Sequence, residues 1–419
     1  MNLSQASILA LIALLWLSGC TSSTKDAAPG PIVSSNLAIF DANRTTLDPS
    51  RWTGGLLVPV FRQLERAARE PTLGVDPDGH VFVGVWDQED LDPNRIDDDE
   101  LGKVLSVYAS FDQGASWRNV RPAPAVLAQV PPTTSDAFFE VDPVTGRLLA
   151  NDWTYGCSTM AISDDDGRSW THSPFGCGLG NGAFDHQSIT TGKPRVSSPT
   201  GYARMVYYCV AAHCAASQNG GLTFGPVVSV FCPGQPGLNP SCTSGSGHVK
   251  TDLDGRVFQG AKRNGLPNVA VSEDDGATWR RSVVNQTLPV YWHDVEVAAD
   301  ASGNLYAFWN SVDGFVYYAL SRDHGTTWGP AINVAPPGLT VTSYPMVAAG
   351  GDGEVAFLFL GTNHTRALIP GSHPSQRLGD MFGARWNWYL TLTTDATHAE
   401  PVFASVPLNS PAEPVAADA

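Results

Sequence analysis

Side chains that can transfer protons, bond hydroxyl groups or ligate metals recur at regular intervals along this chain. They are Glu70, Asp136, Asp185 with His186, His248 with Lys250, His293 with Asp294, and Tyr344. Each stands at or just before the start of a run of β-forming residues. Carboxylates and imidazoles act as general acids and bases, and both ligate divalent metals. Residues so far apart in sequence can act together only if the fold gathers the starts of six strands in one place.

One turn, first seen at residues 110–117, is written five times. The copies begin at Ser110, Ser163, Ser217, Ser272 and Ser321, and the steps between them are 49 to 55 residues. In each copy an Asp or Asn and a Ser or Thr can close a tight turn with hydrogen bonds, Gly supplies a positive φ, and a final Trp or Phe can bury a large ring. A β-forming run precedes each copy, so each copy predicts a β-hairpin.

A second set of turns lies upstream of these hairpins, at residues 76–79, 142–146, 198–201, 252–255, 300–303 and 351–353. One unit is therefore two hairpins, or four antiparallel strands, and units of this period are typical of β-propellers. We predict an all-β fold, a six-bladed β-propeller with four antiparallel strands per blade, over residues 55–408. The sixth unit lacks the repeated turn but keeps strand-like runs. Seven blades are the alternative, if residues 36–40 and 55–61 supply more than an edge strand.

The strand directions place both sets of turns on the same side of the propeller. Neighbouring strands of a blade alternate in direction, so the turn after the first strand and the turn after the third share one face, here called the repeat-turn face. We expect those turns to be structural. The innermost strands then start on the opposite face, the funnel face, which would collect the ring of polar groups. A ring satisfied only by water and neighbouring blades is the alternative interpretation.

The N-terminal residues have the pattern of an export signal. Residues 8–17 are an unbroken apolar run, too short to span a bilayer as a mature helix. The run ends in Leu17-Ser-Gly-Cys20, which resembles the lipobox of bacterial lipoproteins, although no Lys or Arg precedes it. The resemblance implies that residues 1–20 are a signal peptide and that Cys20 is lipidated. Residues 21–54 would be a tether and N-terminal segment, and residues 409–419 a C-terminal tail. We expect a membrane-anchored lipoprotein at the outer membrane or cell surface, with plain secretion as the alternative.

Charge and cysteine content limit the partners further. The chain has 41 acidic and 25 basic residues and a net charge of -16, which argues against nucleic acid as a partner. Without Cys20, six cysteines are left, an even number that favours disulfides in an exported protein. The local pairings are Cys157 with Cys177, Cys209 with Cys214, and Cys232 with Cys242, among fifteen connectivities. We expect a monomer and no cofactor, with calcium or another divalent metal left open at the three funnel-face histidines or the acidic loop 87–100.

The repeated turns resemble the Asp-box, also called the bacterial neuraminidase repeat, and six blades that carry them resemble the sialidase superfamily. Sialidases use a tyrosine activated by a glutamate in place of a nucleophilic carboxylate. The resemblance implies Tyr344 as nucleophile with Glu70 or Glu296 as its partner, and Asp136 or Asp87 as the acid. Carbohydrate would be the substrate or ligand. The remaining funnel-face groups would bind it: Arg69, Asp185, His186, His248, His293, Asp294 and Arg385.

The arginine pattern departs from that family. A sialidase should hold the sugar carboxylate with three arginines, the first in a Phe-Arg-Ile-Pro-like motif. Here residues 61–64 read Phe-Arg-Gln-Leu, without the proline, and no later arginine begins an innermost strand. Arg69, Arg263, Arg377 and Arg385 are the nearest substitutes. The sequence therefore leaves two hypotheses open: an exo-glycosidase or degenerate relative, and a non-catalytic cell-surface propeller that binds glycans or proteins or serves in assembly.

Overall fold

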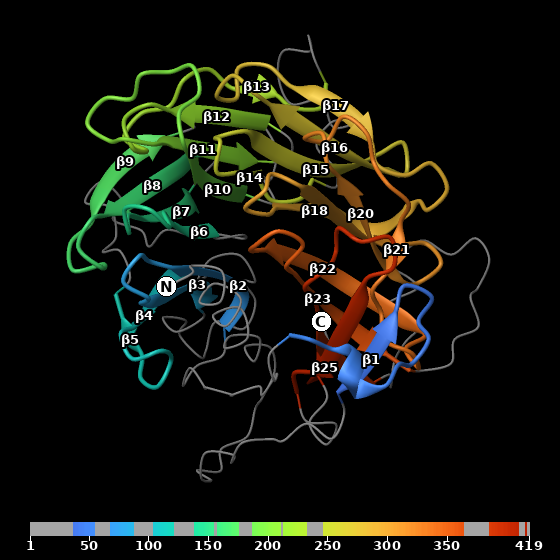
Figure 1. Cartoon of the computed structure of the whole chain (residues 1–419). Coiled ribbons are helices and arrows are strands. Elements are labelled where there is room, and N and C mark those ends of the chain that lie inside the picture. The colour runs from blue at the N-terminus through green and yellow to red at the C-terminus, as the bar shows by residue number, and fades with distance from the viewer. Residues whose placement is uncertain are drawn as a thin grey trace, which may run out of the picture.

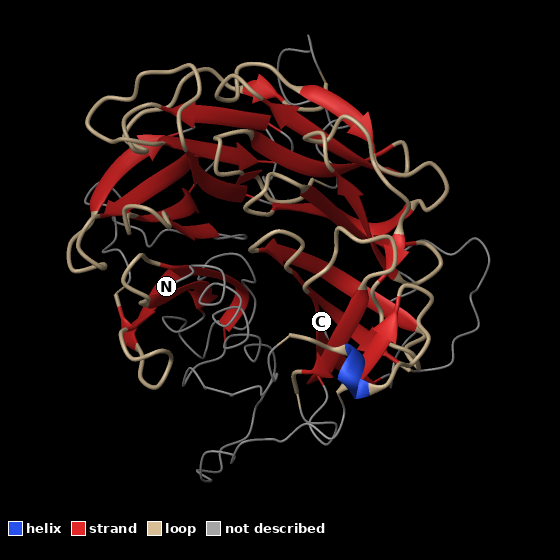
Figure 2. Cartoon of the chain, in the orientation of Figure 1, coloured by secondary structure: helices blue, strands red, loops and turns tan. Residues whose placement is uncertain are grey.

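Six antiparallel sheets stand around a central axis as the blades of a β-propeller (Figure 1). The structure is a computed structural model, and it describes residues 37–54, 68–87, 104–120, 138–154, 157–175, 187–210, 213–232, 246–363, 385–409 and 415–416. Apart from one short 3-10 helix, its regular elements are all strands (Figure 2). The predicted all-β, six-bladed propeller is confirmed. No helix in these ranges is long and apolar enough to cross a bilayer.

The first three blades follow one another in sequence, with four strands each. Blade 1 holds β2 (Ala68–Val75), β3 (Val81–Asp87), β4 (Val104–Ser110) and β5 (Arg118–Asn119). Blade 2 holds β6 (Phe138–Val141), β7 (Leu148–Thr154), β8 (Cys157–Ser163) and β9 (Thr171–Phe175). Blade 3 holds β10 (Gln187–Gly192), β11 (Met205–Val210), β12 (His213–Ser217) and β13 (Val228–Ser229). Each sheet keeps its strands in sequence order, and consecutive strands pair antiparallel.

Blades 4 and 5 repeat this order, and blade 6 adds to it. Blade 4 holds β14 (Lys250–Thr251), β15 (Val257–Arg263), β16 (Leu266–Ser272) and β17 (Arg280–Val283). Blade 5 holds β18 (Val290–Ala299), β19 (Leu305–Ser311), β20 (Val316–Ser321) and β21 (Ile332–Asn333). Blade 6 holds β22 (Val341–Ala349), β23 (Val355–Thr362), β24 (Arg385–Thr393) and β25 (Val402–Pro407). The first strand of each blade is the innermost one, and β2, β6, β10, β14, β18 and β22 contact one another in that order.

The N-terminal strand completes blade 6 rather than starting a seventh blade. β1 (Ala38–Asp41) pairs antiparallel with β25, with Phe40 opposite Phe403, and so becomes the outermost strand of the sheet. A 3-10 turn, η1 (Pro49–Arg51), follows, with Asp48 as its N-cap. Near the other end of the chain, β26 (Val415–Ala416) pairs with the beginning of β24. Both ends of the described chain therefore lie against the last blade.

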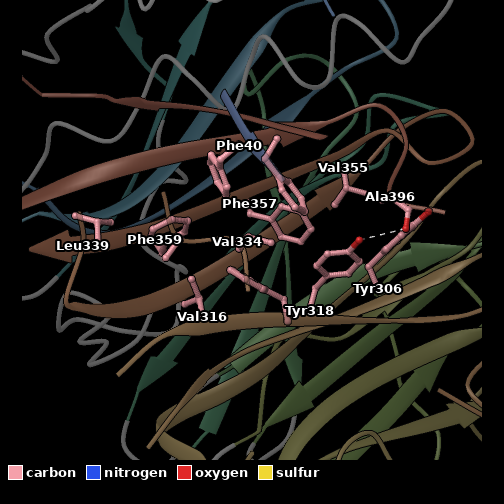
Figure 3. Packing of buried hydrophobic residues seen from close by; sticks show 13 residues of the cluster. Phe40, Tyr306, Val316, Tyr318, Val334, Leu339, Val355, Phe357, Phe359 and Ala396 are labelled. Atoms are coloured by element: carbon pink, nitrogen blue, oxygen red, sulfur yellow. Dashed lines mark hydrogen bonds between the residues drawn. The ribbon is translucent and has the colours of Figure 1, made fainter. Parts of the chain in front are cut away.

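Hydrophobic cores fill the spaces between adjacent blades. Between blades 5 and 6, the rings of Phe308 and Tyr318 lie 4.9 Å and 5.0 Å from Phe357, and Phe40 stacks on Phe403 at 5.3 Å (Figure 3). The Tyr318 hydroxyl donates to the carbonyl of Ala396. Buried rings of this size provide most of the apolar surface that holds blades together.

The repeated turns close as the sequence predicts. In blade 1, Asp112 Oδ1 accepts from Ser110 Oγ at 2.8 Å and from the Ser116 N–H at 2.8 Å, and Ser110 Oγ accepts from the Gly114 N–H at 2.7 Å. The same bonds recur in blades 2 to 5. On the same face, Arg147 after the first turn of blade 2 bonds Asp164 in the repeated turn of that blade.

The sixth blade keeps part of this turn although its sequence hides it. Thr393 Oγ1 donates to Asp395 Oδ1 at 2.7 Å, as Ser does to Asp in the other blades. The same Asp395 oxygen then accepts from the Val402 N–H at 3.0 Å, seven residues on instead of four. This longer loop, with Thr in place of Ser, therefore keeps the side-chain and backbone hydrogen bonds to the turn aspartate.

One of the predicted disulfides is confirmed. Cys209 and Cys214 face each other on β11 and β12 and are bonded. Cys232 is also disulfide-bonded. Cys177 and Cys242 lie outside the described residues, and nothing is described of the Cys157 side chain.

Candidate functional site

Three innermost strands break their pairing register near the funnel face. The shift lies between Arg69 and Thr72 in β2, between Val290 and Val295 in β18, and between Ser343 and Met346 in β22. In each strand the break falls in the first half, away from the repeat-turn face. Bulges aim side chains out of the regular alternation of a strand and are common beside active sites. Among the described residues, the innermost strands of blades 1, 5 and 6 therefore share an irregular start on the funnel face.

These bulges contain four of the predicted site residues. In β2, Glu70 and Pro71 stand opposite one residue of β3, and in β22, Tyr344 and Pro345 stand opposite one residue of β23. Proline has no N–H to give to the ladder, so it suits a bulge. The bulge of β18 contains His293 and Asp294. Predicted catalytic residues from the first and last blades thus occupy equivalent positions.

Tyr344 adopts an uncommon backbone conformation within its bulge. Its φ is +51°, and 43% of its surface is exposed, although it lies on an innermost strand. A left-handed conformation is an outlier for a bulky residue and costs about 1–3 kcal/mol, which the surrounding structure must offset. Outliers of this kind gather at functional sites. Tyr344 is the described residue of β22 that has a positive φ.

A buried ion pair joins blades 4 and 5 further along the channel. His248 Nδ1 lies 3.0 Å from Glu296 Oε1, and the His248 N–H donates to the same oxygen at 3.3 Å. The Glu296 side chain is 8% exposed and that of His248 is 33% exposed. Glu296 is thus engaged with His248.

Two glycines let the blades come close enough for that pair. A Cβ on Gly247 or Gly260 would lie 2.2 Å or 1.9 Å from the carbonyl oxygen of Val295, the residue before Glu296. Backbone this close cannot yield without moving a strand. Glycine at both positions therefore sets the distance between His248 and Glu296.

His248 and its neighbour Val249 also contact blades 2 and 3. The His248 ring lies 5.2 Å from that of Phe138 on β6, and the Val249 N–H donates to Ser188 Oγ on β10 at 3.1 Å. The segment 248–249 therefore touches blades 2, 3 and 5 from its place before β14.

Two channel carboxylates have pKa values that shift in opposite directions. Burial raises the pKa of Glu140, on β6, to about 7, against the opposing effects of Lys250 and of a hydrogen bond from Thr190. Burial also acts to raise the pKa of Glu296. The charge and hydrogen bonds of His248, together with the charge of Lys250, outweigh burial and bring the pKa of Glu296 below its ordinary value. The charge of Lys250 acts to lower the pKa of both carboxyls, and His248 accounts for the lower pKa of Glu296.

The other predicted site residues are placed less completely. Asp136, Asp185, His186 and the proposed lipid site Cys20 lie outside the described residues. For Glu70, Arg69, His293 and Asp294 the structure describes the backbone and not the side chain. Arg385 is exposed at the start of β24, where it pairs with Ala416. His248 and Tyr344 are the predicted site residues on innermost positions whose backbone and side chain are both described.

Arg263 lies at the funnel-face end of β15 and packs its guanidinium over the Phe231 ring at 4.8 Å. Burial lowers its pKa to about 10. Arg62 and Arg377, the other substitutes considered for an arginine clamp, are outside the described ranges.

The sequence interpretation missed Glu140. The signal was present, because a glutamate stands alone between apolar residues in the short strand 138–141, where a surface carboxylate is out of place. Glu140 lies two residues before Asp142, where the first turn of its blade begins, whereas the predicted site residues stand at strand starts.

Several solved structures resemble this chain in fold. An α-L-arabinanase of Penicillium chrysogenum in complex with arabinobiose is 13% identical, with 81% of this chain and 93% of that chain covered and a TM-score of 0.42. An α-L-arabinofuranosidase of Fusarium graminearum with an iminosugar inhibitor is 10% identical, with 83% and 94% covered and a TM-score of 0.45. A mutant sialidase of Streptococcus pneumoniae is 14% identical, with 83% and 63% covered and a TM-score of 0.40. No family model matches the sequence, and no curated protein matches it significantly.

Proposed function

We propose that this chain is an exported, lipid-anchored propeller that acts on carbohydrate at its funnel face as an exo-glycosidase. The observation that carries the proposal is the strained, exposed Tyr344 in a bulge of β22, matched by the Glu70 bulge of β2. The resemblance of the repeated turns to Asp-boxes adds the expectation of a Tyr–Glu pair. Together they support Tyr344 as nucleophile and Glu70 as the base that activates it.

The chemistry follows from these roles. The Tyr344 oxygen attacks the anomeric carbon as its phenol proton passes to Glu70, and Asp136 protonates the leaving oxygen while the glycosidic bond breaks. Asp136 then takes a proton from water, which displaces the tyrosine from the sugar. Glu70 returns its proton to the phenolate, so the enzyme regains its starting state. The anomeric configuration is retained because two displacements occur.

The channel cluster would hold the sugar. His248 is fixed by Glu296 on one nitrogen and is one-third exposed, so it can bond a hydroxyl group. Phe138, which is buried, packs beside the His248 ring at 5.2 Å and helps to hold it in place. Arg69, Asp185, His186, His293, Asp294 and Arg385 would supply further contacts from the funnel face.

Hydrolysis of aryl glycosides, including an aryl sialoside, tests the proposal. The wild-type chain should release the aryl group from at least one of them, and Tyr344→Phe and Glu70→Gln should each lower kcat/KM by about 10³-fold or more. Tyr317→Phe is the matched control, because Tyr317 lies on β20, the third strand of blade 5, and its hydroxyl donates to Asp313 in the turn before that strand. If the protein binds a glycan but turns over none of these substrates, the glycosidase proposal is wrong and the non-catalytic binding propeller is the better explanation.

The export and anchoring part of the proposal has its own test. Cells that express the full chain should incorporate labelled fatty acid into the protein, and Cys20→Ser should abolish both the label and the membrane fraction. A labelled Cys20→Ser protein would exclude lipidation at this cysteine.

A further inference from the structure

Neighbouring blades are joined on the repeat-turn face by a recurring contact. The fourth residue of a repeated turn lies against the first turn of the preceding blade. From blade 3, the carbonyl of Gly220 accepts from Arg147 of blade 2 at 3.1 Å. From blade 4, the Asp275 carboxylate accepts from the backbone N–H groups of residues 195, 196 and 197 of blade 3 at 2.9, 2.9 and 2.7 Å. In both contacts an acceptor meets donors.

Between blades 2 and 1 the same contact brings acceptors together. The fourth residue of the blade 2 turn is Asp166, and it meets Asp76 and His80 of the first turn of blade 1. One ligand atom from each of the three side chains lies within 4.8 Å of the other two. Two carboxylates this close repel each other unless a cation stands between them. The packing of the propeller therefore produces a position where a hydrogen-bond donor or a cation is needed between two carboxylates.

In the first turns of three other blades, the turn aspartate is paired with an arginine or an asparagine. Oδ2 of the turn aspartate contacts Arg204 at 2.9 Å in blade 2, Arg256 at 3.0 Å in blade 4 and Asn304 at 2.9 Å in blade 5. In blade 1, Oδ2 of Asp76 faces His80 Nδ1 at 2.8 Å. Imidazole differs from these donors because it can exchange its proton for a metal ion.

The ligands are held in place before any ion arrives. Asp76 has a 4% exposed side chain, and its Oδ1 accepts from the N–H groups of Asp78 and His80. The His80 ring packs against Phe111 at 4.6 Å. Asp166 is fixed by its own turn at φ +59° and bonded by Arg168 at one oxygen, and its side chain is 27% exposed, like that of His80. Ions in solution can reach the site, and the ligands need little ordering.

We propose that Asp76, His80 and Asp166 bind a divalent transition-metal ion that links blades 1 and 2. Imidazole with carboxylates suits Zn²⁺ and related ions. The metal replaces the proton between His80 Nδ1 and Asp76 Oδ2, and this proton leaves to solvent. Tetrahedral coordination would widen the 2.8 Å nitrogen–oxygen distance to about 3.4 Å. Water completes the coordination. The site lies on the face opposite the funnel, and the proposal does not rest on the proposed function.

Calorimetry with Zn²⁺ on the full-length, tag-free protein in detergent, stripped with a chelator, tests this site. One equivalent should bind at pH 7.5, and Co²⁺ should give a visible spectrum of low coordination number. His80→Gln and Asp166→Asn should each weaken binding by at least about tenfold. His398→Gln, an exposed histidine on the blade 6 turn, should leave binding unchanged.

Two outcomes would overturn the proposal. The first is the absence of stoichiometric binding, in which case the contact of His80 with Asp76 is a hydrogen bond within the turn and nothing more. The second is binding that survives His80→Gln and Asp166→Asn but is lost in His248→Gln, which would place the ion in the funnel. Circular dichroism of the metal-free variants checks that each is folded, and the two ligand variants from different blades guard against failure of either one.

Discussion

The imidazole of His248 on blade 4 lies 3.0 Å from the carboxylate of Glu296 on blade 5, in the interior of the ring. This pair exists because the backbone of blade 4 can approach the Val295 carbonyl at two glycines. The same two glycines therefore determine how closely blades 4 and 5 pack and where His248 lies relative to Glu296.

Gly260→Ala should destabilise the protein by about 2 kcal/mol or more. The added Cβ would lie 1.9 Å from the Val295 carbonyl oxygen, and overpacking against backbone can be relieved only by moving a strand. Urea unfolding measures the change. Gly225→Ala is the control, because its Cβ would meet its nearest atom at an ordinary 3.5 Å. Equal stability of both variants would contradict the close approach of blades 4 and 5.

Glu140 should make the protein less stable as pH rises towards neutrality. Its folded pKa of about 7 exceeds the unfolded value of about 4.3, so between these pH values the folded state holds a proton that the unfolded state has released. The free energy of unfolding should fall by about 2 kcal/mol from pH 5 to pH 8 through this group, which is partly buried.

Glu140→Gln should remove that part of the pH dependence, and the exposed Glu400→Gln should not. Thermal or urea unfolding at several pH values gives the difference between variant and wild type. A Glu140→Gln curve parallel to that of the wild type would show that Glu140 titrates normally.

The repeated turn should tolerate asparagine in place of aspartate and reject alanine. Blade 3 already carries Asn219, whose Oδ1 accepts from the Thr223 N–H at 2.9 Å and whose Nδ2 donates to Thr223 Oγ1 at 2.8 Å. Asp274→Asn in blade 4 should therefore cost less than about 0.5 kcal/mol, and Asp274→Ala about 1–2 kcal/mol, as for lost caps. Equal costs would mean that the side-chain bonds of the turn contribute nothing.

Asp323 should contribute to the loss of stability in acid. Burial raises its pKa, but hydrogen bonds from Thr327, Ser321 and Thr326 bring the pKa down to about 2 in the folded state. A depressed folded pKa adds stability above the unfolded value of about 3.9, and this stability is lost as pH falls from about 4 through 2. Asp323→Asn should unfold with a shallower pH dependence in that window, and an unchanged slope would contradict the shift.

The repeats predict the propeller because they are local. A turn of fixed length with Ser, Asp or Asn, and Gly at set positions specifies a hairpin without reference to the rest of the chain. Five such turns, with six first turns upstream of them, predict the architecture. The facing pair Cys209 and Cys214 could also be predicted from its spacing across a short hairpin. The sequence pattern does not predict the Thr393–Asp395 turn of blade 6, because Thr replaces Ser and the loop is longer.

The site depends on contacts between blades, which no local pattern encodes. The pairing of His248 with Glu296 needs the register of two sheets, and the bulge at Tyr344 appears only when β22 is paired with β23. Likewise Asp76 and Asp166 each look like an ordinary turn residue until neighbouring blades bring them together. The sequence therefore predicts that polar residues gather at the funnel face, but the partner of each polar side chain depends on how the blades pack.

The central claim is that Tyr344 is the nucleophile of a carbohydrate-cleaving funnel. An activated fluorosugar, matched to the substrate that the hydrolysis screen identifies, should trap the covalent intermediate, and peptide mass spectrometry locates the adduct. We predict one sugar on the peptide that contains Tyr344, and none on Tyr344→Phe. A sugar attached to a carboxylate, or steady hydrolysis with no trapped tyrosine, would contradict the claim.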